Sequence, residues 1–68
     1  MNKTEVWNSY EVKFIFDYAI ISVCVFALHE DAAPDLAADM ICYDLGLSRS
    51  LLDKANDIEI NLLDEDVL

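Results

Sequence analysis

Phe14–Leu28 reads FIFDYAIISVCVFAL, a run of fifteen residues in which Asp17 carries the only charge and no Gly or Pro occurs. This length falls short of the roughly 20 residues that a membrane-spanning helix needs, and Asp17 would be costly inside a bilayer. The preceding segment balances two lysines against two glutamates, so it lacks the basic start of an export signal. The run therefore predicts the core of a soluble, cytoplasmic domain.

Two strands are predicted in and before this run. From Tyr10 to Phe16 apolar and polar residues alternate, which is typical of a strand with one buried face. Ile20–Leu28 is apolar on both faces, and its β-branched residues favour a strand over a buried helix. Asp17-Tyr18-Ala19 would form the hairpin loop, although it lacks the Gly or Asn that tight turns prefer. One long bent strand is the alternative.

An acidic helix is predicted after the second strand, from about Ala32 to Leu45. Asp31 suits the N-cap, Pro34 is tolerated in the first turn, and Gly46 suits the C-terminal stop. The predicted buried stripe of this helix consists of Leu36, Ala37, Met40, Ile41 and Tyr43.

Ser48 is expected to cap a short helical turn, and alternation resumes in Asp57–Leu63, DIEINLL, which predicts a third strand. The order strand, strand, helix, strand predicts an α+β fold, a three-stranded antiparallel sheet with helical cover on one face. A right-handed crossover would place the third strand beside the first, in the order 2-1-3. We expect one domain over residues 10–63, with a flexible lead-in at 1–9 and an acidic tail at 64–68.

The apolar content points to self-association. Hydrophobic residues make up 56% of the 68 residues, above the usual share of about 45–50%, and so small a globule cannot bury them all. The order 2-1-3 also leaves the most apolar strand at a sheet edge, which is an aggregation hazard for a monomer. We therefore predict a homodimer that uses Ile21, Val23 and Val25.

The net charge of the chain limits the classes of partner that it can bind. Fourteen Asp and Glu against four Lys and Arg leave a formal net charge of −10. Such a surface repels nucleic acid and anionic membranes, and it attracts basic proteins, including those that handle nucleic acid. The alternative is that the acids only keep an apolar protein soluble.

The sequence predicts no enzyme, no cofactor and no metal site. His29 is the single histidine, it lies among acids, and no motif joins it to a nucleophile. One glycine is too few for a phosphate-binding loop, and the zinc and calcium spacings are absent. Cys24 and Cys42 are too few for a disulfide framework, so we expect reduced thiols, with a single bridge as the alternative.

An acidic ridge is predicted on the helix. Asp31, Asp35 and Asp39 recur at every fourth position, with a rise of roughly 6 Å per step, and Glu30 and Asp44 flank them. A row of carboxylates at this spacing resembles the phosphates of one nucleic-acid strand, which lie about 6–7 Å apart. An ordinary solvated helix face is the alternative. On the first interpretation the ridge is the partner-binding surface, and Trp7 and Tyr43 add apolar contacts.

In size, charge, these ridge acids and the tail Asp64-Glu65-Asp66, the chain resembles the small acidic inhibitors that phages direct against host enzymes. DNA-mimicking anti-restriction and anti-CRISPR proteins belong to that group. The resemblance implies a non-enzymatic protein of the host cytoplasm that binds and inhibits or modulates a basic, nucleic-acid-handling protein. The alternatives are a structural module that self-associates through residues 20–28 and an antitoxin-like partner of a basic toxin.

Overall fold

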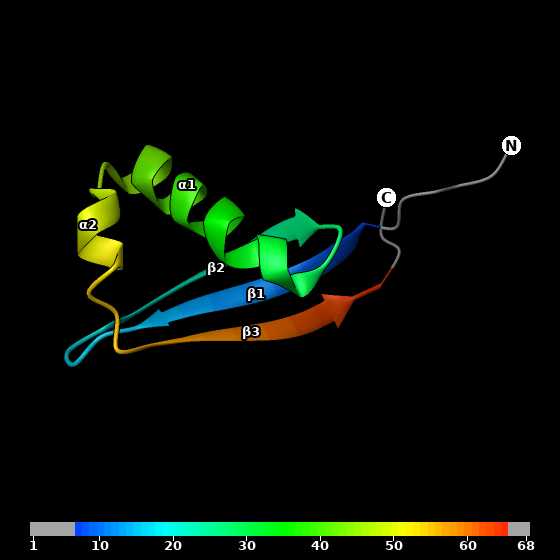
Figure 1. The fold of residues 1–68 in the computed structure, drawn as a ribbon, viewed down its shortest axis with the longest axis horizontal. Helices are drawn as coiled ribbons and strands as arrows, with labels where there is room; N and C mark the ends of the chain where they lie inside the picture. The colour runs from blue at the N-terminus through cyan, green and yellow to red at the C-terminus, as the bar shows by residue number, and fades with distance from the viewer. Residues whose placement is uncertain (1–6, 66–68) are drawn as a thin grey trace, which may run out of the picture.

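A computed structural model describes residues 7–65, which form the α+β fold predicted from the sequence (Figure 1). The parts of the predicted lead-in and tail at 1–6 and 66–68 lie outside the described residues. The three strands form one antiparallel sheet in the order β2-β1-β3, which confirms the predicted order. The elements, in chain order, are β1 (Asn8–Ile15), β2 (Ile20–Ala27), the 3-10 turn η1 (Glu30–Ala32), α1 (Ala33–Leu45), α2 (Arg49–Leu52) and β3 (Asp57–Asp64).

The sheet has a helix face, which α1 and α2 cover in part, and an open face. Directly opposed residues of neighbouring strands project to the same face. On the helix face β1 contributes Tyr10, Val12 and Phe14, all buried. Their partners on this face are Val25, Val23 and Ile21 of β2, and Leu62, Ile60 and Ile58 of β3.

The hairpin between β1 and β2 is closed by a backbone hydrogen bond. The amide of Phe16 donates to the carbonyl oxygen of Ala19 over 2.8 Å, so two strands form and the alternative of one bent strand is wrong. Asn56 ties this end of the sheet to the start of β3. Its amide donates to the carbonyl of Ile15 over 2.7 Å, and its side chain donates to the carboxylate of Asp17.

Helix α1 packs mainly on β2 and less on β1 and β3, and three of its four buried side chains are alanines. Its buried residues are Ala33, Ala37, Ala38 and Ile41. The predicted stripe is therefore only partly right, because Leu36 and Met40 are exposed and Tyr43 is 90% exposed. The side of α1 that faces the sheet holds three alanines and Ile41, and the larger Leu36, Met40 and Tyr43 lie outside this stripe. No helix in the described part of the chain is long and apolar enough to cross a membrane.

The helix ends differ in how well the sequence predicted them. Asp31 does not cap α1, because residues 30–32 form the 3-10 turn, in which the amide of Ala32 donates to the carbonyl of His29. Gly46 does end α1, with a left-handed φ of 68° that favours glycine. Ser48 caps α2 as predicted, since its hydroxyl accepts from the amide of Leu51 over 3.3 Å.

Candidate functional site

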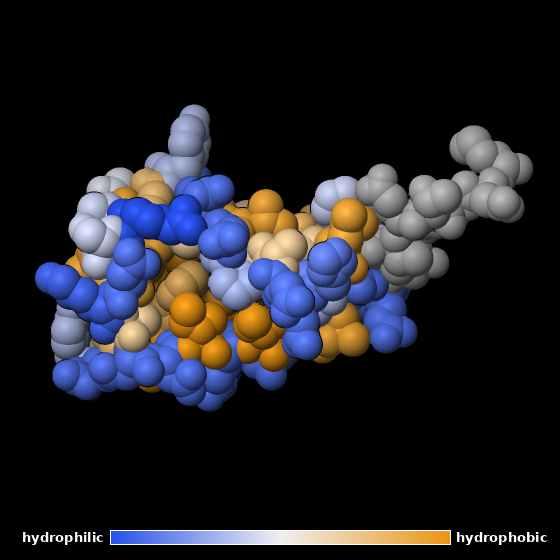
Figure 2. All heavy atoms as spheres, in the orientation of Figure 1, coloured by the Kyte–Doolittle hydropathy of each residue, from blue (hydrophilic) through white to orange (hydrophobic). Residues whose placement is uncertain are grey.

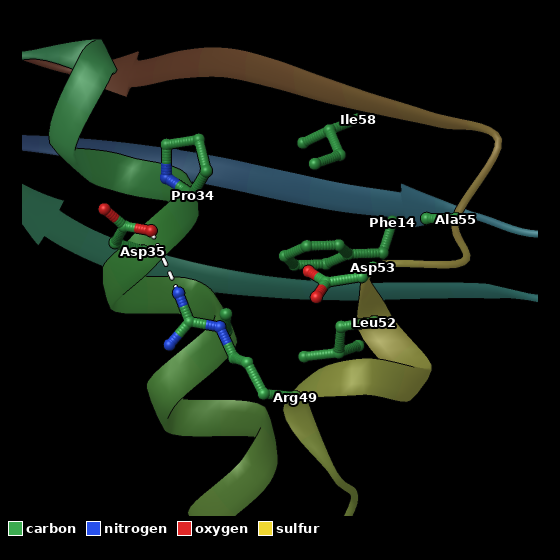
Figure 3. A pocket seen from close by; sticks show the side chains of 9 residues that line it. Phe14, Pro34, Asp35, Arg49, Leu52, Asp53, Ala55 and Ile58 are labelled. Carbon is green, nitrogen blue, oxygen red and sulfur yellow. Dashed lines mark hydrogen bonds and ion pairs between the residues drawn. The ribbon is translucent and has the colours of Figure 1, made fainter.

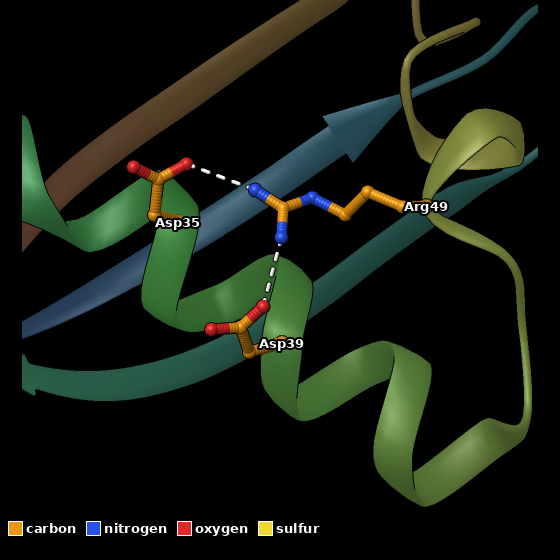
Figure 4. A network of polar contacts seen from close by, with 3 residues as sticks. All are labelled: Asp35, Asp39 and Arg49. Atoms are coloured by element: carbon orange, nitrogen blue, oxygen red, sulfur yellow. Dashed lines mark hydrogen bonds and ion pairs between the residues drawn. The ribbon is translucent and has the colours of Figure 1, made fainter.

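The predicted acidic ridge contains an ion-pair cluster that the helix spacing did not reveal (Figure 4). Arg49, the first residue of α2, lies with its Nη1 atom 2.8 Å from Asp39 Oδ1 and its Nη2 atom 3.0 Å from Asp35 Oδ1. Asp35 and Asp39 therefore do share one side of α1. Asp31 precedes them in η1 and is exposed, as is Glu30, and Asp44 is exposed in the last turn of α1.

Arg49 reduces the negative charge of the acidic ridge. The Asp35 and Asp39 side chains are 81% and 71% exposed, so these pairs contribute only about 0–1 kcal/mol each to stability. Their main effect is on the surface potential, because one guanidinium cancels about half the charge of the two carboxylates. The ridge is thus interrupted by an internal cation, whereas a phosphate row is not. Arg49 stands fourteen residues after Asp35, so only the turn between α1 and α2 brings them together.

A hollow of about 190 Å³ opens beside this cluster, between α1, α2 and the sheet (Figure 3). Asp35, Arg49 and Asp53 provide its charged groups. The apolar part of its lining consists of Phe14, Pro34, Ala38, Leu52, Ala55 and Ile58. The apolar residues suit the aliphatic stem of a lysine or arginine side chain, and Asp53 together with Asp35, which Arg49 already engages, suits its cationic head.

The hollow continues into an apolar strip along β3. Ile58, Ile60 and Leu62 share the helix face, yet α1 leaves Ile58 and Leu62 exposed. Figure 2 shows hydrophobic side chains gathered along β3 beneath α1, bordered by hydrophilic ones. We call this strip together with the hollow the α1–β3 surface. The alternation of these residues predicted the strand, but it does not show how far the helix reaches over it.

Tyr43 and Trp7 were also predicted to contact the partner. Tyr43 extends into solvent from the C-terminal half of α1, on the side of that helix away from its buried alanines. Trp7 directly precedes β1 and is half-buried. Neither residue lines the hollow.

The three residues predicted for self-association lie on the helix face of β2. Val25 is only 4% exposed, while Ile21 and Val23 are half-buried against the core. The side chains that β2 exposes belong to the alternate set, above all Ile20 at 62% and Phe26 at 52%. Self-association through β2 would therefore use its backbone edge and its open-face side chains.

The candidate reactive groups are dispersed. Cys24 and Cys42 are free thiols, so the alternative of a bridge between them is wrong. Cys24 is exposed on the open face and Cys42 is half-buried on α1. His29 is exposed next to η1. Within residues 7–65, no group of three or more His, Cys, Asp or Glu residues is placed to hold a metal ion.

No protein-family model, curated protein or solved structure matches the chain. We therefore infer its function from the surfaces of the molecule.

Proposed function

We propose that the protein is a non-enzymatic acidic binding protein that docks on a basic, nucleic-acid-handling protein and inhibits or modulates it. The α1–β3 surface is the proposed docking site. The observation that carries the proposal is the combination on this surface of exposed apolar side chains with carboxylates at the edge of a hollow. Partner interfaces commonly join an apolar centre to a polar rim in this way.

The charges of the described residues favour a cationic partner. The chain carries −10 overall, and two of its cations are engaged by its own acids: Arg49 by Asp35 and Asp39, and Lys13 by Glu11 at 3.9 Å. Such a surface speeds encounter with a basic protein and slows encounter with nucleic acid, since like charges repel. A basic groove that normally holds phosphates is the surface most complementary to it.

The proposed mechanism is competition for that groove. A lysine or arginine of the partner enters the hollow, where its stem packs on Leu52 and Ile58 and its head meets Asp53 and Asp35. Asp31 adds charge along the same groove. Arg49 tunes the strength of this contact in two ways. An incoming cation competes with Arg49 for Asp35, and an incoming phosphate is attracted to Arg49 itself. The partner's nucleic acid is excluded while the protein is bound.

The test is capture of partners from a cell lysate at about 0.1 M and about 0.5 M salt, with duplex DNA and RNA as competitors. Asp53→Lys should weaken capture about tenfold or more, because it places a like charge against a basic groove. Asp31→Lys should weaken it by a smaller factor. High salt and nucleic acid should both release the partner, since exposed charges are screened beyond about 8–10 Å at ordinary ionic strength.

Glu59→Lys is the matched control. It also moves the net charge from −10 to −8, but Glu59 is exposed on the open face, opposite Lys13. This variant should retain capture within about threefold if location matters more than total charge. Equal losses in Asp53→Lys and Glu59→Lys would remove the α1–β3 surface as the docking site. Captured proteins that are acidic, or that resist salt, would contradict the proposed partner class.

A further inference from the structure

The free edge of β2 is the uncharged edge of the sheet. The strand reads IISVCVFA and has no Asp, Glu, Lys or Arg, whereas the other edge strand, β3, carries Asp57, Glu59 and Asp64. Two copies of a chain with a net charge of −10 repel each other over most of their surfaces. Charge on an edge strand is a recognised obstacle to edge pairing, and β2 lacks it. A second copy is therefore the occupant that this edge fits.

Two backbone hydrogen bonds determine which residues of β2 offer their backbone to that edge. Phe16 and Ala19 form a hydrogen-bonded pair, and such pairs alternate with non-bonded pairs along an antiparallel ladder. The backbone groups of Ile20 consequently point away from β1, as do those of every second residue after it, Ser22, Cys24 and Phe26. The carbonyl of Ile15, paired with Ile20, accepts from Asn56 on the β3 side, as this alternation requires.

We propose that a second copy pairs antiparallel with β2 so that Ile20 of each copy lies opposite Phe26 of the other. Ser22 then lies opposite Cys24 of the second copy, and Val23 lies on the two-fold axis. This register uses all four outward-facing residues, and a shift by two positions leaves at least one of them without a strand partner. It also joins the two most exposed apolar side chains of β2 on the open face of a six-stranded sheet.

Helix α1 supplies further apolar surface beside the same edge. Pro34 and Ala38 line the hollow on the α2 and β3 side, so Leu36 and Met40 lie on the opposite flank of the buried stripe. That flank borders β2, and both side chains are exposed. Edge pairing turns them toward the same pair on the second copy. The interface thus extends from the sheet to the helices, and it does not depend on the proposed function.

Disulfide trapping tests the register, in a Cys42→Ala background throughout. Opposed residues of a hydrogen-bonded antiparallel pair have Cα atoms about 5.5 Å apart, which suits a disulfide. Ser22→Cys should therefore give a covalent dimer with Cys24 of the second copy on mild oxidation. The parent should not, because the two Cys24 residues are diagonal neighbours about 7–8 Å apart. Ser22→Cys combined with Cys24→Ser should also stay uncrosslinked, for the same reason.

Each outcome of the trapping experiment decides the register. A covalent dimer of Ser22→Cys alone supports the proposed pairing. A covalent dimer of the parent would place Cys24 opposite Cys24 and overturn it. Failure of all three proteins to cross-link, on a non-reducing gel calibrated with reduced samples, would also overturn it.

Oligomeric state tests the edge itself, by sedimentation equilibrium from low to high salt. The wild type should be a dimer that added salt does not dissociate, because salt screens the repulsion between the acidic copies. Phe26→Lys should raise the dimer Kd at least about tenfold to a hundredfold, because a buried aromatic contact is lost in each of the two symmetry-related halves of the interface. Leu62→Lys is the matched control, since Leu62 is about equally exposed, and it should retain the dimer. A monomeric wild type, or a dimer lost only in Leu62→Lys, would overturn the proposal.

Discussion

Strands β2 and β3 are both eight residues long, both pair antiparallel with β1, and both form an edge of the same sheet. Tyr10 lies between them, opposite Val25 on one side and Leu62 on the other. Val25 is 4% exposed and Leu62 is 49% exposed, although both are apolar and share the helix face. The difference arises because α1 packs mainly on β2 and covers β3 much less. The alternation along a strand determines which face of the sheet a side chain lies on. The position of the helix determines whether that side chain is buried.

The two edges also expose different kinds of surface. β3 alternates from Asp57 to Leu62, so Asp57 and Glu59 lie on the open face and its apolar strip remains exposed beside the hollow. β2 has no charged residue and is apolar on both faces, so the side chains on its open face, such as Ile20 and Phe26, are exposed apolar groups. The comparison separates the two proposed binding surfaces, an acid-bordered one at β3 for a basic protein and an uncharged edge at β2 for a second copy.

The largest expected effect comes from one substitution made on either side of Tyr10. Val25→Asp would place an unpaired carboxylate beneath α1, so it should lower the free energy of unfolding by at least about 3 kcal/mol, or prevent folding. Leu62→Asp should cost under about 1 kcal/mol, since its side chain reaches water. Urea unfolding followed by circular dichroism measures both. Similar losses in the two variants would contradict the asymmetry of the two edges.

The packing of α1 on the sheet can be tested at Ala37, one of its buried residues. Ala37 is fully buried, so Ala37→Leu should overpack the helix–sheet contact and lower the free energy of unfolding by about 1–3 kcal/mol. Leu36→Ala is the control on the same helix turn, where the exposed side chain should cost under about 1 kcal/mol. Thermal unfolding of both variants measures the difference. A larger loss in Leu36→Ala would mean that the predicted stripe, and not the alanine contact, holds the helix.

The turn between α1 and α2 depends on Gly46, and α2 lines the hollow through Arg49 and Leu52. Gly46→Ala should cost about 1 kcal/mol, because φ is 68° and an alanine disfavours that conformation. A Cβ atom there would meet no atom within 4 Å, so the cost is conformational and not steric. Gly46→Asn should cost less than Gly46→Ala, since asparagine tolerates the left-handed region. Equal costs in urea unfolding would point to a different origin.

The smallest expected effect on stability comes from replacing Arg49, the cation at the hollow. Arg49→Met should lower the free energy of unfolding by under about 1 kcal/mol, because its ion pairs are exposed. It should nevertheless strengthen capture of a basic partner, since it releases the carboxylates of Asp35 and Asp39. Lys54→Met makes the same charge change at an exposed residue that does not line the hollow, and it should affect capture less. Equal effects on capture would show that only total charge matters.

The strands could be predicted well because their signals are local. Period-two alternation marks β1 and β3, and the β-branched run marks β2. The order β2-β1-β3 followed from the handedness of the crossover. The helix stripe was predicted less well, since Tyr43 and Ala38 are both compatible with an amphipathic helix. Hydrophobicity favours the larger residue, but burial depends on which side of α1 faces the sheet, and that side holds Ala38.

The candidate site could be predicted only in part. The acids of α1 were identified by spacing, but their link to Arg49 depends on the turn through Gly46 and Ser48, and no local pattern reveals it. The sequence by itself determined the strand order, the acidic surface and the surplus of apolar residues. Only the tertiary structure decided where that surplus is exposed, because α1 covers one edge of a sheet that has two. Burial depends on what lies above a side chain, and local sequence patterns do not record that.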